Sequence, residues 1–261
     1  MKVSVKIVEE PETKYGNGLF LPPVTAMVRR CSQNALPLVS SCFFVLFSAA
    51  FALCNDTLGA VLLLVSVFVL ICEITGLALA KVPRGGYGLK LRCTAYLISA
   101  VSCGALAVYE ILKGSTLPEI KLDFGLGTIA LPQPFATLIN GGFIHAEIPL
   151  LCLAVSFLAV AVSSGALNRS NRKNRVFNGS TVVSFIINLL CLLCLVADGL
   201  LRLTVLPKIP LLSDLYGASS MAQSITAAVC FAFALCVLFN TINLLIISIR
   251  MRKVKNAVLK A

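Results

Sequence analysis

The apolar stretch over residues 58–80 constrains what this chain can fold into more than any other feature. It carries one charged residue, Glu73, and Lys81 follows it directly. A helix rises about 1.5 Å per residue, so a helix of this length crosses the ~30 Å hydrocarbon core of a bilayer. Glu73 then lies roughly 10 Å inside the membrane, counted from the end next to Lys81. The stretch therefore predicts a membrane-spanning helix with a carboxyl group inside it.

The composition of the whole chain indicates the same class. Of its 261 residues, 58% are hydrophobic and only 13% are charged, and the mean hydropathy is +0.95. A soluble domain carries about 25% charged residues. The formal net charge of +11 does not indicate a nucleic-acid partner, because the basic residues stand in short clusters between apolar stretches. We expect an integral membrane protein surrounded by the lipid bilayer.

Five more apolar stretches have the length of membrane spans. With the first they predict six transmembrane helices, over residues 35–54, 58–80, 93–112, 148–167, 181–203 and 222–249. A chain that is not a barrel crosses a bilayer only as helices, so the expected fold is an all-α bundle of three antiparallel hairpins. The predicted domains are an N-terminal tail over 1–34, a transmembrane domain over 35–249 and a basic C-terminal tail over 250–261.

The positions of Lys and Arg predict the orientation of the bundle. Most of the 22 basic residues lie in the two tails and in the short loops over 81–92 and 168–177. Short loops rich in Lys and Arg stay in the cytoplasm, so we expect both termini to be cytoplasmic. In the non-cytoplasmic loop over 114–141, apolar residues alternate around Gly125 and Gly127, which is typical of a small β-hairpin, although an interfacial coil fits equally well.

Two segments that begin at Thr94 and Thr181 share a pattern that indicates an internal repeat. Each has an apolar span, an acid followed within about a turn by a base, then Leu-Pro, an apolar stretch, an acid and Gly. A repeat of this size indicates that related helical hairpins build the fold.

The acid and base of each repeat are Glu110 with Lys113, and Asp198 with Arg202. Spacings of three and four residues put both members on one helix face, where they can form an ion pair. We expect both pairs to anchor their helices at the outer boundary of the membrane, where a charge costs little. The alternative is a functional pair of acids, because the repeat places the two acids at similar depth.

Glu73 needs a different explanation, because Lys81 is too far along the helix to pair with it. A carboxyl group at this depth is protonated or meets polar side chains of other helices. Asn188, Asn240 and Asn243 lie in the same layer, about 9 to 14 Å from the cytoplasmic ends of their spans. Together with Glu73 they form a candidate intramembrane polar site. The interpretation we favour is simpler: each amide joins two helices, as polar residues in membranes often do.

The chain shows no pattern typical of an enzyme or a metal site. It has no hydrolase, zinc-protease or nucleotide-binding motif, and we expect no enzymatic activity, cofactor or metal. His145 and Glu147 lie two residues apart, which does not place them on one helix face, and we interpret them as interfacial residues. Cys31 and Cys93 each stand beside an Arg at the start of a span, which makes them candidates for S-palmitoylation.

These patterns favour a non-enzymatic multi-pass membrane protein that acts through helix packing, with partner membrane proteins or with copies of itself. The alternative is a small-solute or proton-coupled transporter with a polar site around Glu73. Transporters usually interrupt helices at the site with Gly or Pro. No proline lies in the middle of a predicted span, so transport is the second hypothesis.

Overall fold

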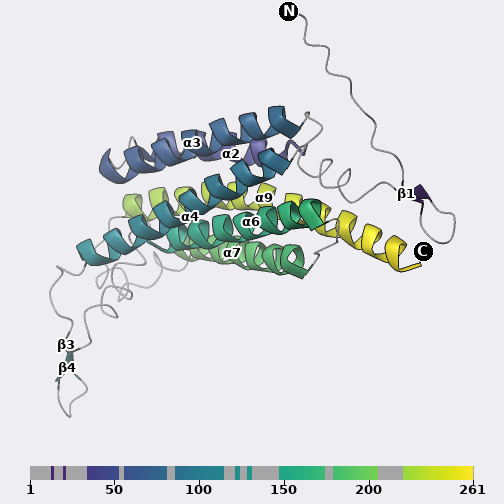
Figure 1. Cartoon of the computed structure of the whole chain (residues 1–261). Helices are drawn as coiled ribbons and strands as arrows, with labels where there is room; N and C mark the ends of the chain where they lie inside the picture. Colours follow the sequence, from purple (N-terminus) through teal and green to yellow (C-terminus); the bar gives the residue numbers. More distant parts are fainter. Residues whose placement is uncertain are drawn as a thin grey trace, which may run out of the picture.

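The fold is that of a computed structural model, and Figure 1 shows it as an elongated bundle of helices. The structure describes residues 13–14, 20–21, 34–52, 56–80, 86–114, 121–123, 128–130, 147–173, 179–204 and 220–260. Within these ranges lie six helices: α2 (Leu36–Ala52), α3 (Asp56–Ala80), α4 (Gly86–Gly114), α6 (Glu147–Lys173), α7 (Gly179–Thr204) and α9 (Ser220–Lys260).

Five of these helices, α3, α4, α6, α7 and α9, are long and apolar enough to cross a membrane. The sixth, α2, is apolar but has only 17 residues, which is about the shortest length that spans a bilayer. Large apolar side chains on the outside of the bundle are exposed, among them Leu64, Val101 and Leu193. Lipid tails solvate such side chains as well as a protein core does. The chain is a polytopic membrane protein whose spans are all helical, as the sequence predicts.

Three of the helices, α4, α6 and α9, extend well beyond the predicted spans, and α6 runs on to Lys173 rather than ending at residue 167. The helix α4 begins at Gly86 rather than at residue 93, and α9 continues to Lys260 through the basic tail over 250–261. Lys and Arg are good helix formers, and their long side chains reach from the apolar region to the membrane surface. A basic residue next to an apolar stretch therefore does not end a helix here.

The six helices pack as three hairpins that close into a ring. The most extensive contacts join α2 with α3, α4 with α6, and α7 with α9. Contacts of α3 with α4, α6 with α7, and α2 with α9 connect the hairpins to one another. The helix α6, which lies between α4 and α7 in Figure 1, also touches α9. Its span is 67% buried, the largest share among the five long spans.

Aromatic rings from four helices fill the middle of the bundle. Phe44 of α2 packs edge to face on Phe157 of α6 and Phe233 of α9, with ring centroids 5.1 and 6.3 Å apart. Tyr96 of α4 lies 5.6 Å from Phe157. All four side chains are buried. Aromatic pairs at these distances add to the stability that burial provides, so this cluster fixes how the hairpins meet.

Two short antiparallel strand pairs lie outside the helices. Strand β1 (Thr13–Lys14) pairs with β2 (Phe20–Leu21). Strand β3 (Lys121–Asp123) pairs with β4 (Thr128–Ala130), with Leu122 opposite Ile129. The second pair favours the hairpin over the interfacial coil, the other alternative for this loop, while Gly125 and Gly127 themselves lie outside the described residues.

Candidate functional site

A buried ion pair joins α3 to α4. Nε of Arg92 donates to both carboxylate oxygens of Glu73, at 2.7 and 3.0 Å, and Nη2 of Arg92 donates to Oε2 at 2.6 Å. The side chains of Arg92 and Glu73 are 5% and 1% exposed. A bidentate contact between guanidinium and carboxylate is among the strongest polar contacts in proteins. It leaves neither oxygen of Glu73 without a donor.

Two glycines place these side chains within reach of each other. Gly76 lies one turn after Glu73, and Gly88 lies one turn before Arg92. A Cβ atom on Gly88 would lie only 2.7 Å from the carbonyl oxygen of Gly76. The backbones of α3 and α4 therefore touch at this point, as small residues allow in membrane bundles. A larger residue at position 88 would push apart the two helices that the ion pair joins.

Two of the candidate partners of Glu73, Asn188 and Asn243, form hydrogen bonds with other residues. Asn188 of α7 accepts a hydrogen bond from Ser156 of α6, at 2.6 Å. Asn243 of α9 accepts one from Asn34, just before α2, at 2.8 Å. Each of these bonds joins two segments of the bundle, which matches the simpler interpretation of the amides.

Asn240 of α9 behaves differently from the other two asparagines. Its side chain is fully buried, and neither its oxygen nor its nitrogen has a hydrogen-bond partner within the described part of the chain. Glu73, Asn188, Asn240 and Asn243 thus do not form one polar site: Glu73 forms a tight ion pair, Asn188 and Asn243 form hydrogen bonds between segments, and Asn240 is a buried amide.

The sequence contains a pattern that could have identified Arg92 as the partner of Glu73. Glu73 and Arg92 lie at similar distances from the short connection over 81–85, one before it and one after it. In an antiparallel hairpin, residues equally far from the turn lie side by side. The prediction missed this pair because it began the third span at residue 93, which put Arg92 outside the membrane.

A second group of buried charges lies at the opposite end of the bundle. Nε of Arg202 donates to Oδ2 of Asp198, four residues earlier on α7, at 3.1 Å. The thiol of Cys230 on α9 donates to the same oxygen, also at 3.1 Å. The ion pair predicted for Asp198 and Arg202 is therefore confirmed.

Glu147 connects this pair to a further carboxyl group, that of Glu110. Glu147 is the first residue of α6, is almost fully buried, and interacts electrostatically with both Glu110 and Arg202. Glu110 of α4 is also buried. We refer to Glu110, Glu147, Asp198 and Arg202 as the Arg202 cluster. Three helices contribute to it, and among the described residues it contains no arrangement of three potential ligands that could hold a metal ion.

The environment of this cluster differs from the expected one. The prediction placed Asp198 and Arg202 at a hydrated boundary, but Arg202 is the largest fully buried side chain among the described residues. Residues of α4, α6, α7 and α9 interact at this end of the bundle, and the charged side chains among them are buried. The side chain of Lys113, the expected partner of Glu110, lies outside the described part of the structure.

One member of the cluster was missed by the sequence analysis, which treated Glu147 as interfacial. Oε2 of Glu147 is buried and has no hydrogen-bond partner within the described residues. Only the packing of α6 against α4 and α7 brings this carboxyl group to the other charges. Spacing along the sequence carries no such information.

Of the two candidate palmitoylation sites, the structure describes only Cys93. Cys31 lies outside the described residues. Cys93 lies in the first part of α4 as a free, half-buried thiol.

No protein-family model, curated protein or solved structure matches this chain. What the protein does must therefore follow from its own residues.

Proposed function

We propose that the protein is a non-enzymatic multi-pass membrane protein that acts by associating with partner membrane proteins or with copies of itself. The contact between Glu73 and Arg92 supports this more than any other observation. A carboxyl group that carries a proton or a solute exchanges its partner during transport. Arg92 instead satisfies both oxygens of Glu73 inside the bundle, and their role is to join α3 to α4.

Other polar groups of the interior also serve contacts within the chain. The hydroxyl of Ser40 on α2 donates to the carbonyl oxygen of Cys236 on α9, at 2.9 Å, and Ser156 binds Asn188. Such bonds between helices contribute about 0.6 kcal/mol each. They favour a bundle that keeps one packing, which is what a protein needs when it presents a fixed surface to a partner.

The outer surface of the bundle is suited to contacts inside the membrane. The exposed face of α7 is apolar over its length, with large side chains at Val183, Ile186, Leu190 and Leu193. A shallow apolar groove of about 370 Å³ lies between α6 and α7. Helices associate in lipid through close packing, because the hydrophobic effect gives no preference for protein over lipid tails.

The number of protein chains in each native nanodisc particle tests this proposal. The fluorescently tagged protein is extracted with its surrounding lipid into nanodiscs, and photobleaching steps and particle mass are measured. Association predicts particles that contain a second copy or another membrane protein. Particles that contain a single chain and lipid alone contradict the proposal.

The Arg202 cluster favours a second candidate function, a small-solute transporter coupled to protons or cations. Glu147 has a buried carboxylate oxygen without a hydrogen-bond partner in the described part of the chain. Buried acids inside membrane proteins often mark proton and ion pathways. If the protein is a transporter, its coupling site is then this cluster rather than Glu73.

A flux measurement separates the two functions. The purified protein is reconstituted into vesicles, a pH gradient is imposed, and its decay is followed with an internal pH dye. Association predicts that the gradient decays as slowly as in empty vesicles. Proton-coupled transport predicts a faster decay that Glu147→Gln abolishes and that the control Asp123→Asn, in β3, leaves unchanged.

A further inference from the structure

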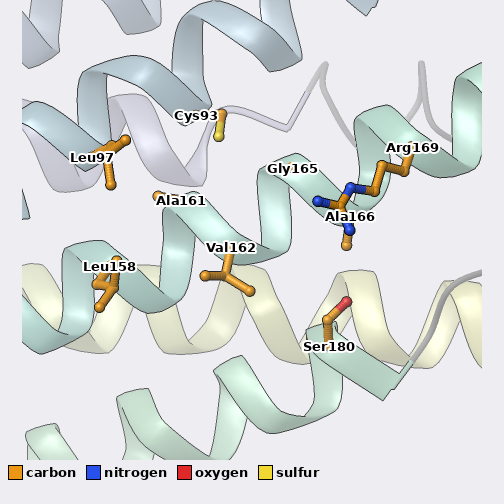
Figure 2. A pocket seen from close by; sticks show the side chains of 9 residues that line it. All are labelled: Cys93, Leu97, Leu158, Ala161, Val162, Gly165, Ala166, Arg169 and Ser180. Carbon is orange, nitrogen blue, oxygen red and sulfur yellow. The ribbon is translucent and has the colours of Figure 1, made fainter.

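A groove on the side of the bundle, at the end where α6 finishes and α7 begins, has features that the proposed function does not use. It has a volume of about 260 Å³ and lies between α4, α6 and α7 (Figure 2). Its walls include Leu97 of α4 and Leu158 and Val162 of α6. Three small residues of α6 also line the groove and leave its space open: Ala161, Gly165 and Ala166. A Cβ atom on Gly165 would lie 3.6 Å from Sγ of Cys93, so the groove depends on a small residue there.

One end of this apolar groove is polar. Arg169 lies one turn after Gly165 on α6, and Ser180 lies in the first turn of α7. In Figure 2 the side chains of Arg169 and Ser180 both line the end of the groove that lies away from Leu158. Arg169 is exposed and has no carboxylate partner within the described residues. An exposed guanidinium group at the mouth of an apolar groove is complementary to an amphiphile with an anionic head.

We propose that the groove binds an anionic phospholipid, with an acyl chain between α4 and α6 and the phosphate group at Arg169 and Ser180. From Leu158 to Arg169 the helix rises roughly 16 Å, which is close to the ~15 Å depth of one leaflet of the hydrocarbon core. The volume is below the roughly 300 Å³ of typical small-molecule pockets, so the groove holds part of one chain while the rest of the lipid stays in the bilayer.

The positive charge at this end of the groove explains why an anionic lipid should bind better than a zwitterionic one. A guanidinium group binds a phosphate group through two parallel hydrogen bonds. Arg172, Lys173 and Arg175 follow Arg169 within six residues of the sequence, so this part of the chain is strongly basic. Basic pockets between transmembrane helices are known to bind anionic headgroups. A zwitterionic lipid with the same acyl chains gains the apolar contact but less of the electrostatic one.

Lipid binding to the intact protein in detergent, followed by native mass spectrometry, tests the proposal. Phosphatidylglycerol and phosphatidylcholine with identical acyl chains are the two probes. We expect phosphatidylglycerol to bind at least about tenfold more tightly, a factor that corresponds to 1.4 kcal/mol. Arg169→Gln is expected to remove this preference, and the control Arg252→Gln, which removes an exposed charge from α9, to keep it.

A second variant tests the apolar part of the groove. Val162 is 50% exposed, so Val162→Phe fills the groove with little effect on folding and is expected to weaken binding of both lipids. Equal binding of the two lipids by the wild-type protein, or an unchanged preference in Arg169→Gln, overturns the proposal. An added acyl mass that persists on denaturation and is released by hydroxylamine also overturns it, because the occupant is then a chain attached to Cys93.

Discussion

Arg92 holds both carboxylate oxygens of Glu73 through three hydrogen bonds of 2.6 to 3.0 Å, and this contact ties α3 to α4. Both side chains are almost fully buried. The interaction explains how a carboxylate is accommodated inside an apolar span, because a buried charge is tolerated when a partner with good geometry satisfies it. It also gives Glu73 a structural role in the bundle.

Removing one member of this pair should be far more damaging than removing both. Arg92→Met leaves the carboxyl group of Glu73 buried without its partner, which costs about 3 to 5 kcal/mol. The double variant Glu73→Leu/Arg92→Met replaces both with apolar side chains and should recover most of that stability. Thermal unfolding of tagged protein in detergent, read by size-exclusion chromatography, measures both. A double variant no more stable than Arg92→Met contradicts the structural role.

The hydrogen bond between Ser156 and Asn188 should contribute much less. Asn188→Ala removes a neutral contact between α6 and α7, and the expected loss lies between about 0.6 kcal/mol, the average measured for such bonds in a membrane protein, and about 1.7 kcal/mol, the largest value. Ser156→Ala, alone and combined with Asn188→Ala, completes a double-mutant cycle in a reversible unfolding assay. Additive effects of the two changes would mean that the bond does not join these helices.

Asp198→Asn should destabilise the protein strongly, in contrast to the expectation from the sequence. A pair at a hydrated boundary contributes only a few tenths of a kcal/mol, but Arg202 is fully buried. Loss of the Asp198 contact therefore costs well above that value, towards the about 3 to 5 kcal/mol of a broken buried pair, and the remaining carboxylates of the Arg202 cluster offset part of the cost. The same unfolding assay distinguishes the two values. If Asp198→Asn lowers the free energy of unfolding by only a few tenths of a kcal/mol, the pair is an anchor at the hydrated boundary, as the sequence analysis expected.

Gly88→Ala should separate α3 from α4. The added Cβ atom lies 2.7 Å from the carbonyl oxygen of Gly76, so the helices move apart at a cost of about 1 to 3 kcal/mol. Gly179→Ala is the matched control, because a Cβ atom there meets no atom within 4 Å. Equal unfolding temperatures for the two variants would show that the backbones do not touch at Gly88.

The sequence predicts the fold well because a bilayer limits the possible structures. A span needs a certain apolar length, and only helices satisfy the backbone within it. The positions of the six helices follow from that rule. Errors occur where the apolar pattern ends: α4 and α9 continue through basic residues, and this continuation places Arg92 inside the bundle.

The candidate sites were harder to predict, because their contacts depend on packing between helices. Glu73 was recognised as a buried acid, since a lone charge in an apolar stretch is visible in the sequence. Its partner was not, since depth alone does not say which helix faces which. In the same way, Glu147 reaches Arg202 only because α6 packs against α7.

The measurement that tests the account most directly is the number of chains in native nanodiscs, compared between the wild-type protein and the double variant Glu73→Leu/Arg92→Met. If the protein acts by association and this pair only holds the bundle together, both proteins form particles with the same composition, containing more than one membrane protein chain. Particles with a single wild-type chain contradict the account. So does a folded double variant that has lost its associates, because Glu73 and Arg92 then serve the association itself.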